Sequence, residues 1–146
     1  MTLAASVLSL ALSGCTVIIT TGIFSDASSS SGVQIIAAVT SHSAALDTVT
    51  THVTNTSARA VFIPRCGSAP LLSTQQFVNG AWSDADSPTC PASSALSPIQ
   101  LDPGLTLVAV SVLTQAGRFR FVTTVGESED FSNSARATSN SFSILR

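Results

Sequence analysis

Most of the chain after residue 32 consists of short stretches in which apolar and polar residues alternate. Residues 48–55 (TVTTHVTN) alternate strictly, so Val49, Thr51 and Val53 share one face and His52 lies on the other. A period of two is typical of a strand with one buried face and one face in water. This stretch therefore predicts a half-buried β-strand.

Two later stretches give strands of different kinds. Residues 118–125 (RFRFVTTV) predict a strand with its aromatic residues inward and its arginines outward. The inward residues are Phe119, Phe121 and Val125, and the outward residues are Arg118 and Arg120. Residues 105–113 (LTLVAVSVL) carry apolar side chains on both faces, which predicts a central strand covered on both sides.

Turn signals separate these stretches. Asn79-Gly80 lies between Phe77-Val78 and Ala81-Trp82 and predicts a two-residue hairpin, because both central positions need a positive φ. Turns are also expected at residues 55–57 (NTS) and 101–104 (LDPG), and loops at residues 83–98 and 126–139. Further strands are expected at residues 33–39, 60–66 and 140–146, with Pro64 at an edge or a bulge.

About seven short strands and no amphipathic helix predict an all-β fold, an antiparallel β-sandwich formed by residues 33–146. The composition agrees, because a chain rich in Val, Thr and Ser and poor in Glu suits strands better than exposed helices.

Charge excludes one class of function. Charged residues make up 10% of the chain, the net charge is −2, and all six basic residues are arginines spread along the sequence. Binding to nucleic acid depends on a cluster of basic residues against phosphates. We therefore expect no nucleic-acid partner.

The first 24 residues carry no charge, and residues 12–15 read Leu-Ser-Gly-Cys. This stretch resembles the signal peptide and lipobox of bacterial lipoproteins. The resemblance implies that residues 1–14 are removed and that Cys15 is acylated and anchored in a lipid bilayer. Residues 15–32 then form a Ser-rich tether, and the domain lies outside the cytoplasm. Thr16 after the cysteine implies the outer membrane or cell surface rather than the inner membrane. The alternative is an uncleaved transmembrane helix over residues 2–24.

Three short motifs follow one another in the domain: Asn55 to Ser57, Leu101 to Gly104, and Gly117 to Arg120. Their order resembles the immunoglobulin-like domains of bacterial exported lipoproteins. The resemblance implies an immunoglobulin-like sandwich over residues 33–146. Trp82 departs from the antibody pattern, because it lies in an apparent hairpin between the two later cysteines.

The chain has three cysteines, Cys15, Cys66 and Cys90. If Cys15 takes the lipid, the other two can form one disulfide bond in an oxidising compartment. The bridge either joins the two sheets or holds the loop of residues 83–98 against the sandwich edge. The alternative is two free buried thiols.

Candidate catalytic chemistry is sparse. The two histidines are His42, expected in a loop, and His52, expected on an exposed strand face, and the sequence has no G-x-S-x-G motif. Neither histidine has further ligands at metal spacing, and no Gly-rich phosphate loop is present. We expect no enzyme activity, no metal and no cofactor.

Recognition of a partner is the function that the sequence favours. Phe77 and Trp82 are large apolar groups on the predicted hairpin, and Arg118 and Arg120 share an outward face suited to an acidic partner. Trp82 either caps the core beside the disulfide, the commoner place for tryptophan, or faces outward as an anchor. We expect a binding or structural module of the cell envelope with a protein or polysaccharide partner. The alternative is an inhibitor or accessory domain that binds a protease or polysaccharide through the sandwich-end loops.

Overall fold

The structure is a computed structural model that describes residues 31–43, 45–86, 88, 90–91 and 97–145. The predicted signal peptide, Cys15 and most of the predicted tether lie outside the described residues. Within the described part, no helix has the length and apolar character needed to cross a membrane. All the strand pairs there are antiparallel, which confirms the all-β sandwich.

One layer is a three-stranded sheet of β1 (Val33–His42), β2 (Asp47–Asn55) and β9 (Thr106–Leu113), in the order β1-β2-β9. Alternation fixes its faces as the sequence predicts: Val49, Thr51 and Val53 are buried, and His52 is exposed. His42 is the last residue of β1, so the prediction of a loop at this residue was wrong.

The other layer is a larger sheet around β10 (Gly117–Gly126). On one side of β10 lie β6 (Ser73–Val78), β7 (Ala81–Asp86), β3 (Val61–Ile63) and β8 (Ile99–Leu101). On the other side β11 (Ser134–Thr138) and β12 (Phe142–Ile144) each pair with β10. A small separate sheet joins β4 (Arg65–Cys66) to β5 (Ala69–Pro70).

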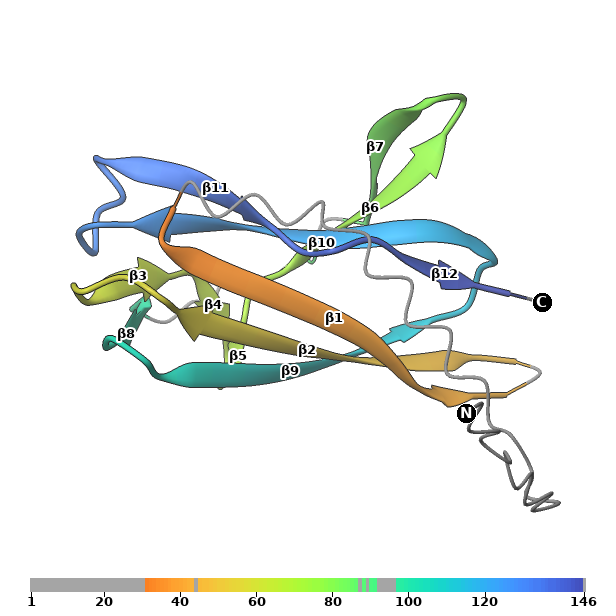
Figure 1. The fold of residues 1–146 in the computed structure, drawn as a ribbon, viewed down its shortest axis with the longest axis horizontal. Helices are drawn as coiled ribbons and strands as arrows, with labels where there is room; N and C mark the ends of the chain where they lie inside the picture. The colour runs from red at the N-terminus through yellow and green to blue at the C-terminus, as the bar shows by residue number, and fades with distance from the viewer. Residues whose placement is uncertain (1–30, 44, 87, 89, 92–96, 146) are drawn as a thin grey trace, which may run out of the picture.

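The two sheets form two layers (Figure 1), and the hydrophobic core takes its side chains from both. Phe119, Phe121 and Val125 enter it from β10, as predicted, while Arg118 and Arg120 lie on the opposite face. From the smaller sheet come Val33, Ile35, Ala37, Val49, Val53 and Ala109. Removing apolar surface from water stabilises a fold by about 25 cal/mol per Å². Burial of these side chains between the sheets is therefore what holds the two layers together.

The predicted turns are present. Asn79 and Gly80 have φ values of 52° and 83° and connect β6 to β7. Gly104 has a φ of 77°, and Leu105 N donates a hydrogen bond to Asp102 O at 3.1 Å, closing the turn before β9. Pro64 follows the last residue of β3, because it cannot donate to the strand ladder.

Three further sequence predictions were wrong. Strand β9 is at the edge of its sheet rather than central, and Val108, Val110 and Val112 are 56%, 65% and 56% exposed. The expected loop at residues 83–98 begins later, since β7 continues to Asp86. The expected loop at residues 126–139 contains β11, because its residues pair with β10 from Val122 to Gly126.

Cys66 and Cys90 form a disulfide bond with a Cα–Cα distance of 5.5 Å. Cys66 lies on β4, outside the two main sheets, and Cys90 lies beyond the end of β7. The bridge therefore follows the second alternative: it fastens the segment after β7 to the small β4–β5 sheet and does not join the two layers.

Candidate functional site: an aromatic and arginine surface on a projecting hairpin

The β6–β7 hairpin extends beyond the sheet to which it belongs (Figure 1). Register places Phe77 directly opposite Trp82 and Val78 opposite Ala81, next to the Asn79-Gly80 turn. Phe77 and Val78 are 38% and 43% exposed. The end of the hairpin therefore presents apolar groups to solvent.

The four residues proposed from the sequence for partner binding come together at this hairpin. The rings of Phe77 and Trp82 meet edge to face, with centroids 5.2 Å apart. Arg118 Cζ lies 5.5 Å from the Phe77 ring centre and 5.7 Å from that of Trp82. Arg120 Cζ lies 4.3 Å from the Trp82 ring centre, well within range of a cation–π interaction. We call Phe77, Trp82, Arg118 and Arg120 the hairpin surface.

Strand pairing explains why residues so far apart in sequence meet. Phe119 pairs with Gln76 and Arg120 with Gln75, so the outward arginines of β10 stand beside the outward side chains of β6. Across the hairpin, Phe77 of β6 pairs with Trp82 of β7, which places the tryptophan on the same face. The sequence identified the outward direction of Arg118 and Arg120, and the register supplies their aromatic neighbours.

Hydrogen bonds hold both arginines in place. Arg120 Nε donates to Gln75 Oε1 at 2.9 Å, and Gln75 Nε2 donates to Asp84 Oδ1 at 2.7 Å. Gln75 is only 5% exposed, so its amide is fixed within the sheet. Arg118 Nε and Nη2 donate to Ser141 Oγ at 3.1 and 2.8 Å. Sequence reasoning missed Gln75 and Ser141, since nothing local marks a polar residue as the partner of a distant arginine.

Trp82 is half-buried against this cluster and lies outside the hydrophobic core. The alternative in which it caps the core beside the disulfide was therefore wrong. Its ring is covered by Phe77 and the two arginines, and its remaining surface faces solvent on the projecting hairpin. Trp and Arg are the residues most often found at the energetic centres of binding interfaces.

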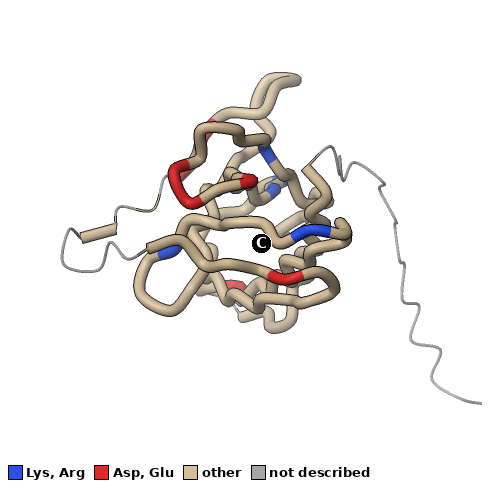
Figure 2. Tube along the Cα trace, turned by 90° about the vertical axis from the view of Figure 1, so that its left-hand side faces the viewer, with Lys and Arg blue, Asp and Glu red and all other residues tan. Residues whose placement is uncertain are grey.

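The rest of the charge on the molecule is sparse. Figure 2 shows short, separated positions of basic and acidic residues along the tube, with no continuous stripe of one sign. At the base of the hairpin Arg136 Nη2 approaches Asp84 Oδ1 to 3.9 Å, with both side chains exposed. Two arginines on one face of β10 therefore stand out against a surface with few other charges.

The two histidines lie on neighbouring strands of the smaller sheet, His42 on β1 and His52 on β2. His42 Nδ1 contacts Asp47 Oδ1 at the β1–β2 connection, where Asp47 is buried and His42 is exposed. The nearby Ser43 hydroxyl donates to Leu46 O, within its own turn. No group of three or more His, Cys, Asp or Glu side chains in the described part is placed to hold a metal ion.

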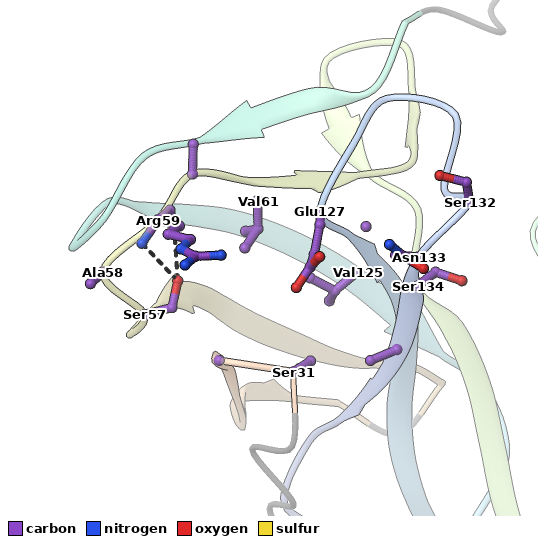
Figure 3. Close-up of a pocket in the computed structure, with 14 residues that line it drawn as sticks. Ser31, Ser57, Ala58, Arg59, Val61, Val125, Glu127, Ser132, Asn133 and Ser134 are labelled. Atoms are coloured by element: carbon purple, nitrogen blue, oxygen red, sulfur yellow. Dashed lines mark hydrogen bonds between the residues drawn. The ribbon is translucent and has the colours of Figure 1, made fainter.

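A second feature was not indicated by the sequence. A pocket of about 810 Å³ lies where the ends of the two sheets separate, between the β2–β3 and β10–β11 connections (Figure 3). Arg59 and Glu127 line it from opposite sides. Arg59 and Glu127 are far apart in the sequence, and only folding brings their two connections together. No local motif could therefore indicate this pocket.

Comparison of the chain with models of known protein families, and with curated proteins, finds no match. Its function is therefore inferred from its own residues and their arrangement.

Proposed function

We propose that this protein is a non-enzymatic module of the cell envelope, lipid-anchored through Cys15, that binds a partner with the hairpin surface. The observation that carries this proposal is the position of the chain's single tryptophan. Burying a large aromatic side chain in the core stabilises a domain by several kcal/mol (roughly 3–5 when measured by truncation to alanine). Here Trp82 is instead held on an exposed hairpin beside two arginines.

The chemistry of the hairpin surface indicates the kind of partner. Two guanidinium groups over aromatic rings favour acidic groups, and the exposed Phe77 and Val78 favour an apolar contact next to them. A protein surface or polysaccharide that carries carboxylates satisfies both requirements. Because the arginines are already ordered by Gln75 and Ser141, binding costs less side-chain entropy.

The cysteines support the envelope location. Cys66 and Cys90 are bonded to each other, which fits an oxidising compartment and leaves Cys15 for another role. Cells that express the natural chain should incorporate an alkyne analogue of palmitate into it, and cells that express Cys15→Ala should not. Equal labelling of the two chains would refute the anchor.

Oxidative footprinting tests the hairpin surface. We expect hydroxyl radicals to oxidise Trp82 more slowly in intact cells than in the purified full chain, because the partner covers the ring. Val110, exposed on β9 of the other sheet, provides the matched comparison and should react at the same rate in both samples. Equal oxidation of Trp82 in cells and in solution would refute partner binding at this surface.

A further inference from the structure

The pocket at the end of the sandwich has charged walls and an apolar floor (Figure 3). Val61 and Val125, both buried, form its floor at the ends of β3 and β10. In the close-up the Arg59 side chain reaches into the pocket from one side and the Glu127 carboxylate from the other. A volume of about 810 Å³ falls within the range of small-molecule sites.

In the part of the chain that the structure describes, neither charged side chain is engaged elsewhere. Among the residues that the structure describes, the Arg59 guanidinium and the Glu127 carboxylate form no hydrogen bond or ion pair, with each other or with a neighbour. In the same part of the chain, the arginines of the hairpin surface do have side-chain partners. The pocket therefore offers one donor group and one acceptor group of opposite charge, separated by open space.

The Arg59 side of the pocket is held rigidly. Asn55 is fully buried, and its Nδ2 donates to Arg59 O at 2.7 Å and to Leu101 O at 2.8 Å. Asn55 Oδ1 in turn accepts hydrogen bonds from Ser57 N and Ser57 Oγ. This network fixes the backbone that carries Arg59 while leaving its guanidinium in solvent.

The Glu127 side is held by a second network. Glu127 N donates to Asn133 O at 3.1 Å, which closes the β10–β11 connection. Within it, Asp130 Oδ1 accepts hydrogen bonds from Ser128 Oγ at 2.6 Å and Ser132 N at 3.1 Å. Both walls are thus ordered before any ligand arrives, which lowers the entropic cost of binding.

The lining distinguishes between classes of ligand. A purely anionic ligand would be repelled by Glu127, and a purely cationic ligand by Arg59. None of the fourteen residues that line the pocket is aromatic, so a sugar would find no ring on which to stack. A molecule with a carboxylate at one end and an ammonium at the other matches both walls.

We propose that this pocket binds a small zwitterion, an amino acid or short peptide with free ends. Its carboxylate contacts the Arg59 guanidinium, and its ammonium contacts the Glu127 carboxylate. Asn133 and the serine hydroxyls of the lining supply further hydrogen bonds. The site is at the sandwich end and does not depend on the hairpin surface.

The test is an NMR titration of the isotope-labelled full chain with the dipeptide Ala-Ala, up to about 20 mM, the range suited to weak binding. We expect amide shifts confined to residues 31–32, 57–61 and 125–135. Acetylating the dipeptide amine or amidating its carboxylate should weaken binding roughly two- to fivefold, as for one exposed ion pair.

Charge-removing variants assign each end of the ligand. Arg59→Gln should bind Ala-Ala and its amide with equal affinity. Glu127→Gln should bind Ala-Ala and its acetylated form with equal affinity. Glu129→Gln, an exposed change on the same loop outside the pocket, should bind as the natural chain does. Blocked dipeptides that bind as tightly as Ala-Ala, shifts elsewhere on the chain, or no shifts at all would overturn the proposal.

Discussion

Arg120 is positioned over Trp82, with Cζ 4.3 Å from the ring centre, while its Nε donates to the buried amide of Gln75. One guanidinium of β10 thus contacts both strands of the projecting hairpin, Gln75 on β6 and Trp82 on β7. Because Gln75 on β6 also donates to Asp84 on β7, its amide connects both strands of the hairpin to β10. The orientation of the hairpin surface therefore depends on these side chains as well as on strand pairing.

Removing the Arg120 charge should destabilise the domain. Arg120→Met keeps much of the side-chain length but loses the cation–π contact and leaves Gln75 Oε1 without its donor, so we expect a loss of about 1–2 kcal/mol. Urea denaturation followed by Trp82 fluorescence measures it. Arg136→Met, at an exposed and long ion pair, should change stability by less than about 0.5 kcal/mol. Equal effects from the two changes would contradict this role of Arg120.

The side-chain amide of Asn140 makes the two hydrogen bonds to Ala37 of β1 that a neighbouring strand would otherwise make. Its Oδ1 accepts a hydrogen bond from Ala37 N at 2.8 Å, and its Nδ2 donates to Ala37 O at 2.9 Å. Asn140→Ala should lower the free energy of unfolding by about 1–3 kcal/mol and speed hydrogen exchange at Ala37 N–H. Asn133→Ala removes an exposed amide and is the control; it should change neither the free energy of unfolding nor the exchange at Ala37. Unchanged exchange at Ala37 would show that the bridge does not form.

The disulfide closes a segment with a sequence separation of 24. The double variant Cys66→Ala/Cys90→Ala should lose roughly 3 kcal/mol of stability, mainly because its unfolded chain is less restricted. Reducing the natural chain should cause a similar loss, since it removes the same covalent link. Guanidinium denaturation of all three samples makes the comparison. A reduced chain as stable as the oxidised one would contradict it.

The β10–β11 connection should respond to acid through Asp130. The Ser128 hydroxyl, and after it the Ser132 amide, lower the pKa of Asp130 below its ordinary value of 3.8 by stabilising the carboxylate. Because the folded pKa is the lower one, the interaction is fully present above about pH 4 and is lost as pH falls through the folded pKa. Carboxyl-carbon NMR should show Asp130 titrating below 3.8, and Ser128→Ala should raise that pKa. A natural Asp130 that titrates at or above 3.8 would contradict the arrangement.

Alternation along the strands was enough to predict much of the fold. The faces of β2 and β10, the Asn79-Gly80 hairpin and the disulfide pairing all follow from local pattern or from counting cysteines. The immunoglobulin-like connectivity stays a prediction. Arg118 and Arg120 were placed outward by the same rule that placed Phe119 and Phe121 in the core.

Local pattern does not say what covers a given face. The valines of β9 alternate like those of a buried strand, yet no second layer covers Val110 in the described part of the chain. The prediction that Trp82 caps the core was wrong for a similar reason, because the environment of Trp82 depends on the register between β6, β7 and β10. The pocket of Arg59 and Glu127 could not be predicted, since its walls belong to connections of different strand pairs.

Photo-cross-linking in living cells tests the hairpin surface most directly. A photoreactive amino acid in place of Val78, at the end of the hairpin, should give one discrete adduct, which Trp82→Ala should reduce severalfold. The same amino acid in place of Val110, which is more exposed but lies on the other sheet, should give none. An adduct from the Val110 position with none from Val78, or a Val78 adduct that Trp82→Ala leaves unchanged, would contradict binding by this surface.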